Sequence, residues 1–138
     1  MAYDPNNVFA RILRGEIPCH SVYEDDDTLA FMDIMPQAEG HTLVIPRAPA
    51  EGILDLPEDA LAATIRTTRK VATAVKLAFD PPGIMIAQLN GAPAGQSVFH
   101  LHFHVVPRYA GKDFRMVAGE MADPKLLAEH AARIRAHL

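Results

Sequence analysis

The chain has 138 residues, 49% of them hydrophobic and 22% charged, a composition that allows one globular domain to bury a core without disulfides or metals. The formal net charge of −4 argues against a general nucleic-acid binder, which carries a basic face, but allows a local site for a small anion. Cys19 is the single cysteine, no apolar run reaches the length of a membrane span, and no signal-like segment opens the chain, so we expect a cytoplasmic protein.

The amino-terminal stretch predicts a short helix. Asp4-Pro5 has the form of an N-cap followed by proline in the first helical turn. Apolar residues then recur at helical spacing over residues 8–13, and Gly15 is a plausible end of the helix. One short amphipathic helix is therefore expected before residue 15.

Three strands are expected next. Residues 22–24 and 28–34 read as two strands, joined by three consecutive aspartates that suit a tight turn. Residues 41–46 read as a buried strand that ends at a proline. Asp33 is unusual because it is an acid within an apolar run, and a buried carboxylate needs polar partners.

The second half of the chain predicts a long helix, two strands and a last helix. The long helix opens at residues 56–59 and reaches about Phe79, where Asp-Pro-Pro-Gly follows. A strand at 84–89 leads through a turn-rich loop to a second strand. Residues 112–117 read as a loop or short strand, and Asp123-Pro124 starts the last helix. This order of elements indicates an α+β fold with a mainly antiparallel sheet.

The strand after the turn-rich loop carries three of the seven histidines, at every second position. Residues two apart in a strand share a face, so His100, His102 and His104 are expected to line one side. The alternate residues would then dock on the core: Phe99, Leu101, Phe103 and Val105. Neutral imidazole can act as a nucleophile, a general base or a metal ligand, and the spacing alone leaves nucleophilic catalysis and metal binding level.

The histidine stretch resembles the signature of the histidine triad (HIT) family: His100-Leu101-His102-Phe103-His104-Val105-Val106. Upstream motifs match the Hint branch of this family in order: Gly15-Glu16-Ile17-Pro18, Tyr23-Glu24-Asp25-Asp26, Leu29-Ala30-Phe31-Met32-Asp33-Ile34 and Gly40-His41-Thr42-Leu43-Val44-Ile45-Pro46-Arg47. The Pro107-Arg108 ending resembles bacterial Hint-like members and also Fhit-type hydrolases. The resemblance implies a HIT-like fold, a meander sheet with a short first helix, a long central helix and a last helix. It implies one HIT domain over residues 1–138, with a core at about 8–108 and an extension at 109–138.

The resemblance also implies a reaction, attack on the α-phosphate of a purine nucleoside phosphoramidate or acyl-nucleotide. By position His102 would be the nucleophile and would carry the nucleotidyl group, and the product would be a nucleoside monophosphate. His104 would donate to a phosphate oxygen, His100 would support the geometry, Ser97 would assist the leaving group, and Asp33 would accept from the ribose hydroxyls. The other nucleotide contacts implied by the family are Phe9, Ile12, Ile17, Phe31, Ile34, His41, Asn90, Gly95 and Gln96, with Asn90 one residue short of the family spacing.

Some bacterial relatives bind a structural zinc, and this chain departs from their pattern. Asn7 and Ala10 stand at the cysteine positions, and the later histidine position falls near Pro49, so we expect no structural zinc, no cofactor and no metal in the reaction centre. Family members are homodimers joined through the long helix and an edge strand. The implied partners are therefore a purine nucleotide and a second copy of the chain, without nucleic acid or membrane.

Three other functions remain open from the sequence. One is a Fhit-like dinucleoside polyphosphate hydrolase. Another is a purine-nucleotide-binding protein whose hydrolysis is incidental. A metal-dependent enzyme is the weakest of the three.

Overall fold

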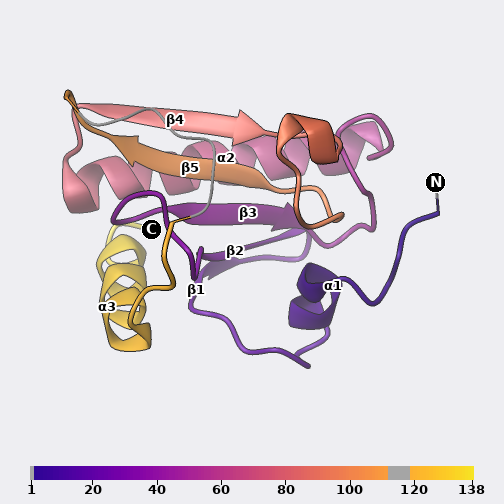
Figure 1. Ribbon diagram of the computed structural model, residues 1–138, viewed down its shortest axis with the longest axis horizontal. Coiled ribbons are helices and arrows are strands. Elements are labelled where there is room, and N and C mark those ends of the chain that lie inside the picture. Colours follow the sequence, from indigo (N-terminus) through magenta and orange to yellow (C-terminus); the bar gives the residue numbers. More distant parts are fainter. Residues whose placement is uncertain (1, 112–118) are drawn as a thin grey trace.

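The computed structural model describes residues 2–111 and 119–138 and is drawn in Figure 1. In chain order the elements are α1 (Val8–Leu13), β1 (Ser21–Glu24), β2 (Thr28–Met32), β3 (Thr42–Pro46), α2 (Glu58–Phe79), β4 (Gly83–Gln88), the 3₁₀ turn η1 (Ala92–Ala94), β5 (Phe103–Arg108) and α3 (Pro124–Arg135). The stretch expected as a loop or short strand at 112–117 lies outside the described residues. Within those residues no helix combines the length and the apolar character needed to cross a bilayer.

The strands form one antiparallel sheet in the order β1-β2-β3-β5-β4. The first three strands follow one another as a meander. The chain then crosses through α2 to the far edge, where β4 lies, and β5 returns between β4 and β3 (Figure 1). The expected α+β fold with an antiparallel sheet is thereby confirmed, and the α2 crossover puts β5 in the interior of the sheet.

One face of the sheet is covered by α2 and α3, and α2 runs behind the strands in Figure 1. Alternate strand residues point to this face, among them Ala30, Val44 and Val105, all fully buried. The helices contribute residues such as Val71 and Ile134, which have no exposed surface. On this face, the strands and the two helices therefore enclose a filled core.

The opposite face carries the other alternate residues and, in the described part of the chain, is covered by the six-residue helix α1 together with the loop residues Cys19 and Val98. Phe31 of β2 and Leu43 of β3 point to this side and pack with Phe9 of α1. Leu43 lies opposite His104 in the β3–β5 register, so the side chain of His104 emerges on the same face. Because both faces are covered, β2 and β3 are buried at every residue, which explains their near-continuous apolar sequences.

Helix α1 begins later than the sequence predicts. The N-cap is Asn7, whose side chain accepts from the N–H of Ala10 at 2.9 Å, and not Asp4. Asp4 instead accepts from the N–H of Asn6 at 2.8 Å and shapes the turn before the helix. The aspartate turn between β1 and β2 is as expected, since Asp25 accepts from the N–H groups of Asp27 and Thr28.

Candidate active site

A pocket of about 290 Å³ opens on the α1 face of the sheet. This volume is at the lower end of the usual range of small-molecule sites, about 300–1,000 Å³. Ten of the predicted site residues line it: Phe9, Ile12, Ile17, Phe31, Asp33, Ile34, Gly95, Ser97, His102 and His104. Apolar side chains dominate one end, and the carboxylate and the two imidazoles supply polar groups, so the pocket can take a ligand with an apolar ring and an anionic group.

His102 has a fixed tautomer. Its Nδ1 lies 2.8 Å from the carbonyl oxygen of His100, and a carbonyl can only accept, so Nδ1 carries the proton. Nε2 therefore keeps a free lone pair. The ring packs edge-on against Phe9, with centroids 4.9 Å apart, and this contact and the backbone bond hold its orientation.

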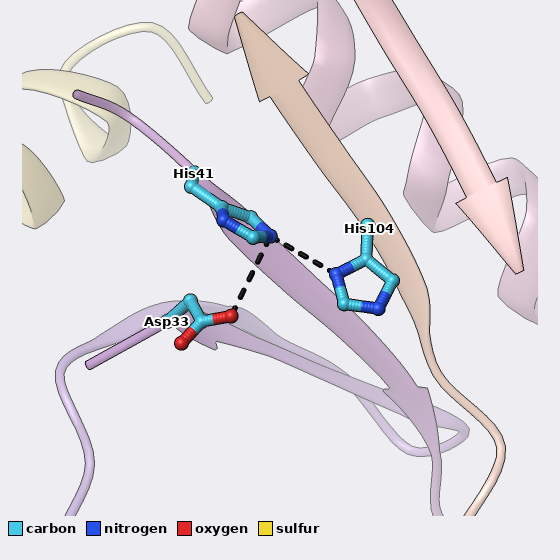
Figure 2. Close-up of side chains that lie close together, drawn as sticks. All are labelled: Asp33, His41 and His104. Atoms are coloured by element: carbon cyan, nitrogen blue, oxygen red, sulfur yellow. Dashed lines mark hydrogen bonds and ion pairs between the residues drawn. The ribbon is translucent and has the colours of Figure 1, made fainter. Parts of the chain in front are cut away.

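His104 is set by a relay through His41 (Figure 2). The N–H of Gln37 donates to Nδ1 of His41 at 3.0 Å, so the proton of neutral His41 is on Nε2. That Nε2–H donates to Nδ1 of His104 at 3.0 Å, with Oδ2 of Asp33 at 3.5 Å as a second acceptor. His104 must then carry its own proton on Nε2, the nitrogen that Figure 2 shows pointing away from His41.

His100 lies behind the site, fully buried, and does not line the pocket. Its Nε2 donates to the carbonyl oxygen of Pro46 at 2.8 Å. The structure corrects one expectation here, because β5 begins only at Phe103 and the first two triad histidines precede the strand. Leu101 still enters the core and its N–H donates to the carbonyl of Ala50, whereas Phe99 is only half-buried and lies outside the core.

The imidazoles of the site are neutral near pH 7. Burial is the largest cause and lowers the pKa of His102, His104 and His41 to about 4 each. Burial also lowers the pKa of His100. With the tautomers above, the pocket meets one imidazole with a free lone pair, His102, and one with an N–H, His104.

Asp33, His41 and His104 are also the described residues whose ligand atoms come within 4.8 Å of one another and could hold a metal ion. The hydrogen bonds disfavour that use. A metal on Nε2 of His41 needs a lone pair there, but the Gln37 N–H places the proton on that nitrogen. A neutral imidazole cannot accept at Nδ1 and coordinate at Nε2 together, so the donor set fits a hydrogen-bond relay better than a metal site.

Three predicted nucleotide contacts, His41, Asn90 and Gln96, do not line the pocket, and His41 is buried against His104. Gln96 is buried, and its Nε2 donates to the carbonyls of Glu51 at 2.6 Å and Val98 at 3.0 Å. Asn90 accepts from the N–H of Ile53 at 2.8 Å. The Gln96 amide is occupied by backbone groups, and the Asn90 amide by the Ile53 N–H and the Gln88 side chain, so both side chains hold the loop between β4 and β5 in place.

The same loop brings Gly95 and Ser97 to the pocket wall. Gly95 has φ +105°, a conformation that side chains rarely adopt, and a Cβ there would also lie 3.2 Å from Leu89. Ser97 is exposed, so its hydroxyl is accessible to a ligand. The backbone turn at Gly95 thus brings Ser97 into the wall of the same pocket as His102 and His104.

Gln37 is a pocket residue that the sequence analysis did not identify. Its backbone N–H orients His41, and its side-chain Oε1 is buried without a hydrogen-bond partner among the described residues. An orphan acceptor in a pocket wall is available to a ligand hydroxyl. No sequence pattern marks it, because Gln37 stands in an irregular turn.

The pocket wall at Ile34 and Met35 is held by the carboxy-terminal extension. The N–H of Gly119 donates to the carbonyl of Met35 at 3.1 Å, and that of Ala122 donates to Ile34 at 2.9 Å. Ile34 follows the end of β2 and is half-exposed, so these backbone bonds position a segment that the sheet does not hold.

Comparisons with known proteins agree with this geometry. The family model of the HIT domain matches residues 14–111. An uncharacterized HIT-like protein of Methanocaldococcus jannaschii is 42% identical over 120 residues, covering 86% of this chain and 92% of its own. The crystal structure of a HIT-like protein from Bartonella henselae, described as involved in cell-cycle regulation, superimposes with a TM-score of 0.94 at 48% identity over 100% of both chains.

The chain therefore belongs to the histidine triad family, whose members are nucleotide-binding hydrolases and transferases. A more distant relative, the adenylylsulfatase HINT3 of Arabidopsis thaliana, is 37% identical over 101 residues, which are 73% of this chain and 51% of HINT3.

Proposed function

We propose that this protein hydrolyses purine nucleoside phosphoramidates or acyl-nucleotides through a nucleotidyl intermediate on His102. The observation that carries the proposal is the pairing of tautomers in the pocket. His102 offers a lone pair, and its neighbour His104 offers an N–H, with ring centroids 4.9 Å apart. A nucleophile next to a donor of this kind matches the needs of attack on a phosphoryl group.

In the first step, Nε2 of His102 attacks the α-phosphorus and the bond from phosphorus to the leaving group breaks. A carboxylate leaves with the electron pair of that bond, and an amine leaves after its nitrogen takes up one proton from solvent. The Ser97 hydroxyl donates to the departing atom. The Nε2–H of His104 donates to a phosphate oxygen as charge develops there. The positive charge on the His102 ring is stabilised by the His100 carbonyl, which accepts from Nδ1–H.

In the second step, water attacks phosphorus and breaks its bond to Nε2 of His102. The products are a nucleoside monophosphate and free His102, and the proton of the water goes to solvent. No step in this sequence requires a metal ion.

The pocket shape supports a purine nucleotide as the substrate. The apolar side chains of Phe9, Ile12 and Phe31 can contact the face of a ring, and they offer no polar atoms for hydrogen bonds to its edge. Asp33 and the unpartnered Oε1 of Gln37 offer acceptors for ribose hydroxyls. The name of HINT3 indicates hydrolysis at an adenylyl group, which is the same class of reaction.

A homodimer and one HIT domain over the whole chain are part of the proposal. β4 is an edge strand with Ile86 44% exposed, and Ile65 and Leu77 of α2 are 46% and 59% exposed. Unpaired strand edges and apolar side chains of this kind favour association with a second copy. Sedimentation of the protein at several concentrations measures whether it forms a dimer.

The decisive experiment is a trap for the intermediate. The protein is mixed with an adenosine phosphoramidate that carries a radioactive α-phosphate and quenched without acid, and the labelled residue is located by peptide mapping. Label on His102 supports the proposal. Label on another residue, or turnover abolished by chelation and restored by one metal, contradicts it.

A substrate panel separates the remaining alternatives. Faster turnover of a dinucleoside polyphosphate than of an adenosine phosphoramidate or an acyl-adenylate would favour the Fhit-like function. Tight purine-nucleotide binding with negligible turnover of every conjugate would favour a binding protein.

A further inference from the structure

The amino-terminal arm before α1, residues 2–7, contacts His100 through Tyr3 and is held in place by hydrogen bonds. The carbonyl of Asp4 accepts from the side chain of Asn7 at 2.7 Å, and the carbonyl of Pro5 accepts from the Arg14 guanidinium at 2.6 Å. These contacts fix the segment that carries Tyr3. The arm also lines a shallow hollow that shares Ser97 with the pocket.

The phenol of Tyr3 reaches the first triad histidine. The Tyr3 hydroxyl lies 2.6 Å from Nδ1 of His100, and the two rings meet edge to face with centroids 5.6 Å apart. The direction of this bond is determined, because Nε2 of His100 must donate to the Pro46 carbonyl and Nδ1 is therefore an acceptor. Tyr3 is the donor.

His100 is fully buried, so no water replaces the phenol readily. Without Tyr3, Nδ1 would be a buried acceptor with no partner, which costs more than an ordinary hydrogen bond contributes. The ring could recover a partner only by turning or by exchanging its tautomer, and either change removes the donor from the Pro46 carbonyl. The backbone at His100 would then lose one of its two anchors and would be held by the bond from the Leu101 N–H to the Ala50 carbonyl.

That backbone matters because the carbonyl of His100 accepts the proton on Nδ1 of His102. We propose that Tyr3 is a positioning residue for the reaction at His102, acting through the His100 ring and then through the His100 carbonyl. This inference rests on the proposed function. A relay of one part-buried and one buried hydrogen bond connects the amino-terminal arm to the nucleophile, and its second bond sets which nitrogen of His102 attacks.

The test compares Tyr3→Phe with a matched control, Tyr23→Phe. Both variants remove one phenolic oxygen and keep the ring. Tyr23 lies in β1 and does not line the pocket, and its hydroxyl is hydrogen-bonded to the side chains of Asp25 and Lys70. For Tyr3→Phe we expect kcat with an adenosine phosphoramidate to fall about threefold to tenfold and KM to stay within about twofold. For Tyr23→Phe both constants should match the wild type.

A spectroscopic readout separates this inference from the proposed function. Nitrogen-15 NMR of the histidine rings reports which nitrogen is protonated, in the absence of any substrate. In the wild type, His100 should show a protonated Nε2 and a hydrogen-bonded Nδ1. Tyr3→Phe should shift the Nδ1 resonance of His100 and broaden that of Nδ1 in His102, while Tyr23→Phe leaves both in place.

Three outcomes overturn the inference. The first is a kcat of Tyr3→Phe equal to that of the wild type, and the second is a rise in KM alone. The third is a spectrum of His100 that does not change in Tyr3→Phe. If the wild type itself fails to turn over conjugates, the proposed function fails and Tyr3 has no reaction to position, while the ring spectra still decide whether the Tyr3–His100 bond exists.

Discussion

The two faces of the sheet receive side chains from the same strands, yet one face is filled and the other holds a pocket. In β2, Ala30 points into the core under α2 and α3, whereas its neighbour Phe31 points into the pocket wall under α1. The difference follows from the covering elements, because α2 has 22 residues and α3 has 12, but α1 has only 6. A short helix does not fill the space over this face of the sheet, and the space that it leaves is the pocket.

The comparison teaches that stability and chemistry are divided between the faces. The filled face packs aliphatic side chains with no exposed surface, such as Val71 and Ile134. The other face buries neutral histidines at a cost in solvation, as their lowered pKa values show. Substitutions on the filled face should therefore leave turnover nearly unchanged, and substitutions on the pocket face should leave stability nearly unchanged.

The largest effect is expected from His102→Asn on the pocket face. The amide can still donate to the His100 carbonyl, so the fold is kept, but the nucleophilic nitrogen is lost. We expect kcat to fall by at least about a thousandfold. Steady-state turnover and thermal unfolding of the same sample check both halves of this statement, and a variant with turnover near that of the wild type would contradict the assignment.

Ile134→Ala on the filled face should have the opposite effect. The side chain has no exposed surface, so truncation leaves a cavity and lowers the free energy of unfolding by about 2–5 kcal/mol. Urea denaturation measures the loss. Turnover per folded molecule should stay at the wild-type value at temperatures where the variant is folded, and a large fall in kcat would show that the two faces are coupled.

Acid should destabilise the protein through the pocket face. In the unfolded chain His41, His102 and His104 take up protons below about pH 6.5, but in the fold they do so only near pH 4. The unfolded state binds more protons in this window, so the free energy of unfolding falls as pH drops, by at most about 3 kcal/mol for each histidine. Urea denaturation at several pH values measures how steeply the free energy of unfolding depends on pH. This dependence should be shallower in His102→Asn, and an unchanged dependence would show that burial of His102 does not lower its pKa.

The smallest effect is expected from Ile12→Ala at the apolar end of the pocket. Ile12 is half-buried and lines the cavity, so truncation removes contact with a bound ring and little of the core. We expect the affinity for adenosine monophosphate to fall about tenfold. Calorimetric titration measures it, and the loss of unfolding free energy should be smaller than for Ile134→Ala; the reverse order would place Ile12 in the core.

Much of the fold is predictable because the periodicities are strong. Strands buried on both faces give apolar runs, and the long helix and Asp123 at the start of α3 carry ordinary signals. The predicted start of α1 was wrong because Asp4 and Asn7 are both good N-cap residues. The choice between them depends on which helix start packs Phe9 onto the sheet.

The site is less predictable because its contacts join distant residues. The sequence indicates that His102 and His104 act together, but the tautomer of His104 depends on the backbone N–H of Gln37 through His41. Tyr3 is 97 positions from its partner His100, and no local pattern marks it. The family resemblance implies ligand contacts at Asn90 and Gln96, and only the packing of their loop shows that other groups of the chain, the Gln88 side chain among them, occupy both amides.

The backbone pairing between Gly119 and Met35 has a consequence for the extension beyond β5. A Cβ at position 119 would lie 2.1 Å from the carbonyl oxygen of Pro36, a distance that no atom pair tolerates, so only glycine allows this close crossing. Any larger residue there would displace the pocket-lining segment at Met35, without touching an imidazole. The carboxy-terminal segment thus supports the pocket wall at Ile34 and Met35.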